Sequence, residues 1–243
     1  MKKVKTIVPI VLALLLIQAC NSIPFKSTKA DNKADSASYM IGISVGYSLK
    51  MQDVPDVNVA LISKGIKDVM EKDSTVSMQD ANMFLSAYFN ELREVKAQQN
   101  MEKGQEFLAE NKMKAGVIET ESGLQYKVIQ EGTGKSPVET DRVKCHYRGR
   151  LISGEEFDSS YDRGMPAEFS LRGVIRGWTE GLQLMKEGGK YELYVPASLA
   201  YGIRGGGQKI GPNETLIFEI ELLEILPPQP EQKGNMDMKR MPR

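Results

Sequence analysis

The stretch that decides the fold is residues 174–202, VIRGWTEGLQLMKEGGKYELYVPASLAYG. Within it, residues 177–185 place apolar side chains at helical spacing, and Gly188 and Gly189 follow where a helix is typically closed. The pattern then changes, because apolar and polar residues alternate over residues 191–195. Such alternation predicts a strand with one buried face. The stretch therefore predicts a short helix followed by a β-strand.

Further alternating segments flank this stretch on both sides. Residues 124–128 and 143–148 precede it, and residues 216–222 follow it. Strands that bury one face and solvate the other are typical of antiparallel sheets. We therefore predict an α+β fold over residues 117–227, in which a curved antiparallel sheet wraps around the short helix. The proline-rich and charged tail, residues 228–243, is expected to be disordered.

In the first half of the chain, helical periodicity replaces alternation. Apolar stripes predict helices around residues 39–51 and 62–70. A longer helix is predicted over residues 78–114, because a capping box precedes it and no proline interrupts it. Its middle, residues 96–100, is polar, so we expect it to bury no face there and to act as a spacer. Gly104 is the weak point of this predicted helix.

The predicted helices offer a thin core for a domain that folds alone. Their stripes are rich in methionine and tyrosine, which suggests an adaptable apolar surface. These residues are Met40, Tyr47, Met51, Met70, Met83 and Tyr88. Because pairing two copies would supply the missing burial, we expect residues 36–116 to be an all-α homodimerisation domain that includes the connecting helix. The alternative is a single helical bundle whose stripes cover one another.

The start of the sequence predicts a leader that is removed. Lysines precede an apolar segment, residues 7–17, which is too short to span a bilayer. It runs into IQAC at residues 17–20, which resembles a bacterial lipobox. We therefore expect residues 1–19 to be a lipoprotein signal peptide, with Cys20 acylated and residues 20–35 forming a flexible tether. The alternative is an ordinary signal peptide with an incidental cysteine.

Composition and motif content exclude several classes of function. Lys+Arg equals Asp+Glu at 32 each, so there is no basic excess of the kind that marks a nucleic-acid-binding surface. With one histidine, and only Cys145 left after cleavage before Cys20, a structural zinc site and an internal disulfide are both excluded. Residues 132–136 look like the end of a phosphate loop, but Ile129 stands where glycine is required. We expect no metal, no cofactor and no nucleic-acid partner.

What remains is a constellation of mostly aromatic and aliphatic residues in the second half of the chain. Its members are Tyr147, Phe157, Asp158, Val174, Ile175, Trp178, Tyr201 and Phe218. Because it contains almost no titratable chemistry, a site built from it would act by shape and desolvation rather than through a nucleophile. The alternative is that these residues are simply core, and the pattern alone leaves both interpretations open.

The segments that carry this constellation resemble the FKBP-type peptidyl-prolyl isomerases in order and approximate spacing. They are YRG at residues 147–149, EFDSS at 156–160, VIRGW at 174–178, AYG at 200–202 and PNETL at 212–216. The resemblance covers residues 123–226. Further upstream, residues 39–50, 107–112 and 122–129 are similar to macrophage infectivity potentiator-type isomerases, which dimerise through an N-terminal helical domain.

The resemblance implies a pocket for a proline ring, with Trp178 as its floor. The Ile175 N–H and the Tyr201 hydroxyl would each receive a substrate carbonyl. Asp158 would orient Tyr147 or polarise the rotating amide, so that Tyr147, Asp158 and Tyr201 are the implied catalytic residues. The implied substrate-binding residues are Phe157, Phe169, Val174, Ile175, Trp178, Ile210 and Phe218.

Two departures from the family pattern affect the walls of this pocket. Ala167 stands where an aromatic residue is expected, and Phe169 would fill part of that wall. After Tyr201 the loop contains Gly205-Gly206-Gly207, where eukaryotic members carry more apolar residues. Substrate preference is therefore expected to differ, while the floor at Trp178 is retained.

Two functions from different classes fit these observations. The first is a prolyl isomerase that assists the folding of exported, proline-containing polypeptides by desolvating the twisted X–Pro amide. It would be lipid-anchored in the bacterial cell envelope, at the outer membrane, facing the periplasm or the cell surface. The second is a holdase chaperone, in which the helical dimer binds unfolded clients and the pocket is a binding module.

Overall fold

The computed structural model describes residues 32–52, 54–72 and 74–227. The predicted signal peptide, Cys20, most of the predicted tether and the predicted disordered tail lie outside these residues. The chain divides into two compact units, of which the first ends at Val57 and the second begins at Asn58.

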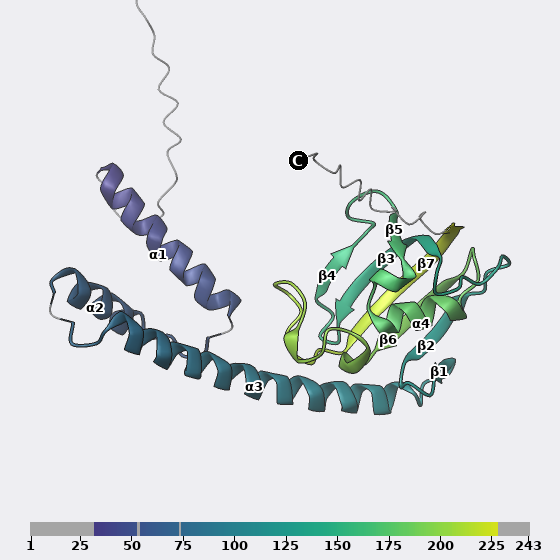
Figure 1. Cartoon of the computed structure of the whole chain (residues 1–243), viewed down its shortest axis with the longest axis horizontal. Coiled ribbons are helices and arrows are strands. Elements are labelled where there is room, and N and C mark those ends of the chain that lie inside the picture. The colour runs from purple at the N-terminus through teal and green to yellow at the C-terminus, as the bar shows by residue number, and fades with distance from the viewer. Residues whose placement is uncertain (1–31, 53, 73, 228–243) are drawn as a thin grey trace, which may run out of the picture. The chain divides into compact units, whose positions relative to one another are not determined.

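The first unit contains helix α1 (Lys33–Met51), shown in purple in Figure 1. Asn32 caps it, because its side-chain oxygen accepts hydrogen bonds from the backbone N–H groups of Ala34 and Asp35. The helix therefore begins inside the segment predicted to be a tether, before the expected boundary at residue 36. α1 contains no buried residue, and its Tyr39, Tyr47 and Met51 side chains are exposed.

The second unit begins with helix α2 (Val59–Met70) and helix α3 (Met78–Asn111). The predicted capping position is confirmed, because the Ser77 hydroxyl accepts a hydrogen bond of 3.1 Å from the Asp80 N–H. α2 contains no buried residue, and Met83 and Phe84 on α3 are exposed. The stripes of α2 and of the first half of α3 are therefore not buried against each other.

The second half of α3 corrects the expectation that its polar part buries no face. Ala97, Asn100, Gly104 and Asn111 are all buried. Burial is possible because the polar members are hydrogen-bonded to the sheet domain, as buried polar groups generally are. Gly104 is no break in the helix but a point of close approach, since a Cβ there would lie 2.3 Å from the Thr215 hydroxyl oxygen.

The sheet domain has the predicted antiparallel architecture. Its described strands are β1 (Val117–Glu119), β2 (Gln125–Gln130), β3 (Arg142–Leu151), β4 (Glu156–Ser159), β5 (Ala167–Ser170), β6 (Lys190–Val195) and β7 (Leu216–Leu226). They form one sheet in the order β1-β2-β6-β7-β3-β4, and β5 also pairs with β3. The short strands β1, β4 and β5 were not predicted from the alternation, whereas β2, β3, β6 and β7 were.

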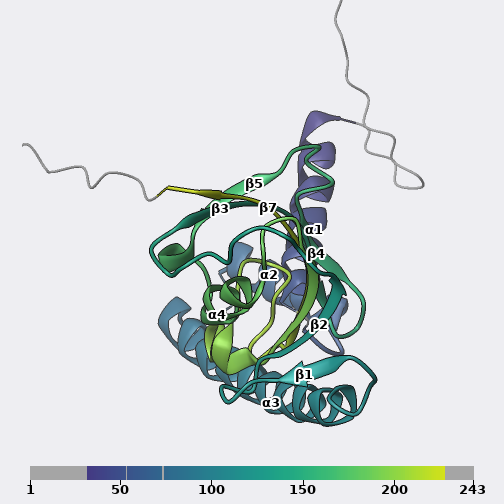
Figure 2. The same cartoon turned by 90° about the vertical axis from the view of Figure 1, so that its right-hand side faces the viewer.

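Helix α4 (Arg176–Leu184) is the predicted short helix and lies against the concave face of the sheet (Figures 1 and 2). Two glycines on α4 allow the close approach. A Cβ at Gly177 would lie 2.4 Å from a Val195 methyl carbon, and one at Gly181 would lie 2.4 Å from a Leu193 methyl carbon. The core lies between this helix and the sheet, and it places Trp178, in the first turn of α4, beneath a surface pocket.

Candidate active site

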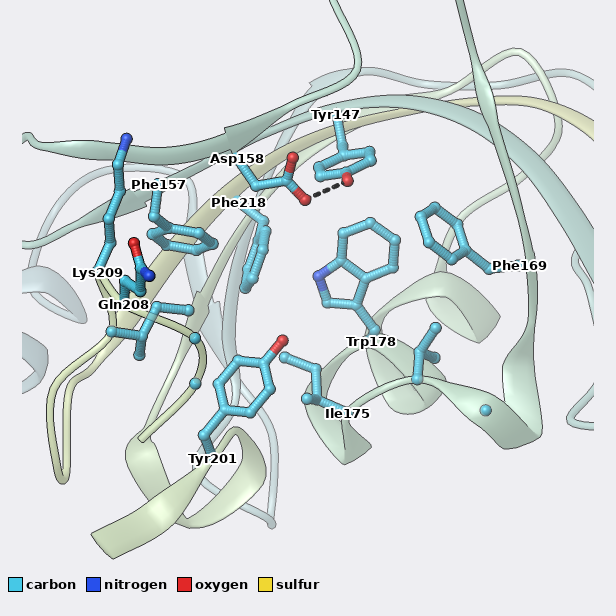
Figure 3. A pocket seen from close by; sticks show the side chains of 15 residues that line it. Tyr147, Phe157, Asp158, Phe169, Ile175, Trp178, Tyr201, Gln208, Lys209 and Phe218 are labelled. Atoms are coloured by element: carbon cyan, nitrogen blue, oxygen red, sulfur yellow. Dashed lines mark hydrogen bonds between the residues drawn. The ribbon is translucent and has the colours of Figure 1, made fainter. Parts of the chain in front are cut away.

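A pocket of about 810 Å³ opens above α4 (Figure 3). Every residue predicted for the site lines it: Tyr147, Phe157, Asp158, Phe169, Val174, Ile175, Trp178, Tyr201, Ile210 and Phe218. Gly173, Gly206, Gly207, Gln208 and Lys209 complete the lining and were not predicted as site residues. The fold thus brings together segments from β3, β4, β5, α4, β7 and the loop between β6 and β7.

Trp178 lies at the centre of an aromatic cluster that forms the floor. Its indole is only 4% exposed. Tyr147, Phe169 and Phe218 each meet it edge to face, with ring centroids 5.2 Å away. Such geometry is favoured by the ring quadrupoles, so the cluster fixes the indole in place. Trp178 is therefore both a core residue and the base of the pocket, which unites the two interpretations of the sequence.

Phe169 fills the wall that Ala167 leaves open. Both residues lie on β5, where side chains two positions apart point to the same face. The Phe169 ring packs against Tyr147 as well as Trp178, with centroids 5.6 Å and 5.2 Å away. The aromatic contact is thus supplied two residues further along the strand.

The Asp158 carboxylate of the site is hydrogen-bonded by two neighbouring side chains. Asp158 on β4 accepts a 2.5 Å hydrogen bond from the Tyr147 hydroxyl through one oxygen and a hydrogen bond from Arg163 through the other. The second Arg163 nitrogen also donates to the Tyr147 hydroxyl oxygen, at 2.7 Å. Arg163 was not predicted as a site residue, because it lies in an irregular loop after β4 and carries no periodic signal.

This pairing fixes the protonation states of the site. Burial opposes ionisation of Asp158, but the hydrogen bonds from Tyr147 and Arg163 outweigh it and hold the pKa of Asp158 below its usual value. Burial, reinforced by the Asp158 carboxylate, raises the pKa of Tyr147 to about 12. Near neutral pH a neutral tyrosine and a carboxylate therefore line the pocket, and the Arg163 guanidinium is hydrogen-bonded to both.

Three hydrogen-bond donors at the pocket have no partner among the described residues: the Trp178 indole N–H, the Tyr201 hydroxyl and the Ile175 N–H. The last two could reach a substrate carbonyl. The Tyr201 hydroxyl points into the pocket (Figure 3), and the pKa of Tyr201 is raised by burial and by the Asp158 charge. Ile175 is the N-cap residue of α4, and no hydrogen bond from its N–H to another described residue is present. These are the two donors that the resemblance assigned to substrate carbonyls.

The wall opposite Phe169 is a tight hairpin loop. Gly206 and Ile210 exchange backbone hydrogen bonds of 2.9 Å and 3.2 Å, which brings Ile210 back over the pocket. Gly205 and Gly207 turn the chain with positive φ angles of 68° and 61°, which favour glycine. The Lys209 ammonium donates to the Glu156 carbonyl at 2.9 Å and so ties the loop to β4.

The remaining titratable groups near the site have structural roles. His146 lies on the outer face of β3, hydrogen-bonded to Ser160 and stacked on Tyr161. Cys145 is fully buried, and burial raises its pKa to about 12. In the part of the chain that the structure describes, no cluster of His, Cys, Asp and Glu side chains could hold a metal ion. No helix within the same residues is long and apolar enough to cross a membrane.

Comparison with known proteins agrees with this geometry. A family model described as FKBP-type peptidyl-prolyl cis-trans isomerase matches residues 133–223, and a model for the domain amino terminal to it matches residues 34–128. The FKBP-type isomerase FkpA of Aeromonas hydrophila is 42% identical over 227 residues, covering 87% of this chain and 84% of that protein. The chain belongs to the FKBP-type peptidyl-prolyl isomerases.

Other members of the FKBP-type family match over most of the chain. The outer membrane protein MIP of Legionella longbeachae is 41% identical, covering 92% of this chain and 98% of that protein. The crystal structure of FkpA from Escherichia coli is 37% identical and has a TM-score of 0.62, covering 81% of this chain and 98% of that one. The predicted fold, a helical domain followed by an FKBP-like domain, and the isomerase activity are thereby confirmed.

Proposed function

We propose that the pocket receives the proline ring of an X–Pro segment on Trp178 and accelerates isomerisation by desolvating the twisted amide. The observation that carries this proposal is the aromatic floor, in which Trp178 is surrounded edge to face by Tyr147, Phe169 and Phe218. Its polar neighbours include the paired Asp158 carboxylate, the Ile175 N–H and the Tyr201 hydroxyl, and the described lining contains no serine, cysteine or histidine.

The energetics of the reaction fit an apolar pocket. Rotation about an X–Pro bond crosses a barrier of roughly 18–20 kcal/mol because conjugation is lost. Uncatalysed exchange takes about 10–100 s, so millisecond turnover needs a ~10⁴–10⁵-fold acceleration, or roughly 6–7 kcal/mol. The twisted amide has a less polar carbonyl than the planar ground state, and a dry pocket therefore favours it.

The polar groups of the pocket would have two roles, binding substrate carbonyls and orienting Tyr147. The Ile175 N–H and the Tyr201 hydroxyl would hold substrate carbonyls on either side of the bond that rotates. Asp158 would orient Tyr147, because Tyr147 and Arg163 already occupy both carboxylate oxygens. This geometry favours the orienting role over direct polarisation of the amide.

The test compares two tyrosines on opposite faces of the sheet domain. Tyr201→Phe removes only a hydroxyl that points into the pocket, and we expect kcat/KM on an X–Pro peptide to fall about tenfold. Tyr161→Phe removes a hydroxyl that donates to Glu221 on the outer face, and turnover should be unchanged. A protease-coupled assay measures both, and equal activity of the two variants would rule out the assigned role of Tyr201.

The biological setting that we propose is the bacterial envelope, where the isomerase would assist folding of exported proteins. The lipobox-like IQAC at residues 17–20 supports a lipid anchor on Cys20, and a relative named for the outer membrane supports that location. Cys20→Ser should abolish incorporation of a labelled fatty acid and release the protein from membranes. Retention of the label in that variant would exclude acylation at Cys20.

We also propose that two copies pair through α1, α2 and the first half of α3. These helices expose apolar side chains that a partner would cover, among them Tyr47, Met70 and Phe84. Phe84→Glu should convert a dimer to a monomer in light scattering while leaving isomerase activity on a short peptide intact. A monomeric wild-type protein would contradict the proposal.

The same exposed helices favour a second candidate function, a holdase chaperone. In that case Tyr201→Phe should still suppress aggregation of an unfolded client as well as the wild type does. Loss of suppression in parallel with isomerase activity would instead assign the client effect to the pocket.

A further inference from the structure

The pocket loop is attached to α3 as well as to the sheet. Residues 201–215 carry Tyr201 and Ile210 and return to β7, and their second half contacts the buried face of α3. We propose that Asn100 and Asn213 are positioning residues of the isomerase site, through which α3 holds the Tyr201 hydroxyl and Ile210 in place. This inference rests on the substrate-binding roles proposed above for those two residues.

Asn213 connects α3 directly to the residue that follows Tyr201. Its side-chain amide donates to the Ala97 carbonyl on α3 at 3.3 Å, and its backbone N–H donates to the Gly202 carbonyl at 2.9 Å. Asn213 has a positive φ of 54°, a conformation that asparagine tolerates better than most residues. One residue thus spans the distance between the helix and the Tyr201 segment.

Asn100 makes the second connection, next to Ile210. It is 5% exposed, and its side-chain amide donates to the Pro212 carbonyl at 2.8 Å. Gly211, which separates Ile210 from Pro212, leaves room for this contact, since a Cβ there would lie 3.4 Å from the Asn100 amide nitrogen. The pocket residue is therefore two positions from an anchor on α3.

α3 can serve as a fixed reference because other contacts determine its position. The Asn111 side chain donates to Gln125 at 3.0 Å, and Gln125 donates to the Leu108 carbonyl at 2.8 Å. Asn111 and Gln125 are fully or almost fully buried, so both hydrogen bonds are costly to break. The close approach of Gly104 to Thr215 sets the register of the helix against the loop.

The loop of residues 201–215 is internally packed, so fixing it against α3 also fixes its pocket side chains. The Tyr201 ring lies so close to Gly206 that a Cβ at Gly206 would be 3.0 Å from it. Gly206 in turn is paired with Ile210 by two backbone hydrogen bonds. A continuous series of contacts therefore leads from Ala97 and Asn100 to the side chains of Tyr201 and Ile210.

The experiment removes the two connections while preserving the backbone. Asn213→Gly keeps access to positive φ but loses the donor to Ala97, and Asn100→Ala loses the donor to Pro212. In the full chain, we expect the double variant to lose about three- to tenfold in kcat/KM on an X–Pro peptide, and each single variant less. Gln99→Ala, an exposed position on the same helix, is the matched control and should keep full activity.

A second readout separates positioning from stability. Trp178 is the only tryptophan in the chain, so its fluorescence reports on the pocket floor. At a temperature well below unfolding, the double variant should show faster acrylamide quenching of Trp178, whereas a purely structural role would lower only the melting temperature. A lower melting temperature with unchanged kcat/KM and unchanged quenching would overturn the inference.

Measuring Tyr201→Phe together with the asparagine variants distinguishes failure of the proposed role of Tyr201 from failure of the inference about α3. If Tyr201→Phe loses turnover and the double asparagine variant does not, only the inference about α3 fails. If Tyr201→Phe also retains full turnover, the role of Tyr201 fails and the inference falls with it.

Discussion

The two halves of α3 differ in a way that hydrophobic periodicity does not anticipate. In the first half, the apolar side chains of Met83 and Phe84 are 69% and 70% exposed. In the second half, the polar side chains of Asn100 and Asn111 are 5% and 1% exposed. An amphipathic stripe shows that one face of a helix is apolar and needs a packing partner. A polar side chain, in contrast, can be buried only where the folded chain supplies a hydrogen-bond partner for it. The change from exposed apolar to buried polar side chains therefore lies within the helix rather than at its end.

The largest effect is expected from cutting the chain at the predicted boundary. Residues 117–227 would lack the second half of α3, leaving the buried Gln125 without its Asn111 and Leu108 partners and exposing Tyr194, which packs on Phe107. We expect this fragment to be at least about 3 kcal/mol less stable than residues 90–227. Urea unfolding followed by Trp178 fluorescence measures the difference, and equal midpoints would mean that α3 is only an accessory.

A smaller effect on stability is expected from replacing single glycines by alanine, and its sign should differ between the second half of α3 and α2. Gly104→Ala places a methyl group 2.3 Å from the Thr215 hydroxyl oxygen, so we expect a loss of about 1–3 kcal/mol. Gly65→Ala on α2 meets open space and should stabilise its helix by about 1 kcal/mol.

Thermal unfolding of both alanine variants provides the measurement. If Gly104→Ala stabilises the protein as Gly65→Ala does, then the contact between α3 and Thr215 does not form as described.

The smallest effect is expected from removing the charge of Glu214, which precedes Thr215 at the contact with α3. Burial raises the pKa of Glu214, and the neighbouring Lys96 and Lys103 oppose this only in part. Because the pKa of Glu214 is higher in the folded state than in the unfolded state, folding favours the protonated carboxyl. This carboxyl therefore contributes stability at low pH, which is lost as pH rises through the folded-state pKa. Glu214→Gln should therefore stabilise the protein at pH 7, by no more than about 0.5 kcal/mol.

The pH dependence of this difference is the critical observation. The advantage of Glu214→Gln should disappear below about pH 4, where the wild-type carboxyl is protonated in both states. An advantage that persists at pH 3 would show that charge is not its cause.

The elements that could be predicted from the sequence are those whose periodicity extends over enough residues to be recognised. The alternation in β3 and β7 and the stripes in α2 and α4 extend over several residues, and all four elements are present. β4 and β5 have four residues each, too few to show a period. The docking of α3 was missed because its asparagines bond to Pro212 and Gln125, partners that only the folded chain identifies.

The same distinction applies to the site: residues in local sequence motifs could be predicted, and residues placed by tertiary contacts could not. Most of the predicted pocket residues lie in short motifs, so the family resemblance could assign them to a position in the chain, whereas Phe169, Ile210 and Phe218 lie outside those motifs. Arg163 lies in a loop outside those motifs, and its place beside Asp158 depends on how the chain turns after β4. Lys209 likewise reaches the Glu156 carbonyl from 53 residues away.

The burial of Cys145 has a consequence for the chemistry of the clients. Capture by disulfide exchange requires a thiolate that an incoming sulfur can reach, and the Cys145 thiol is neutral at physiological pH and enclosed by the core. Under the proposed function, unfolded chains that carry free cysteines would therefore enter and leave the pocket without forming a mixed disulfide at Cys145. For the same reason, a pair of cysteines introduced on the surface of α3 could be labelled selectively over Cys145, which would allow the distance between the two labels to be measured in solution.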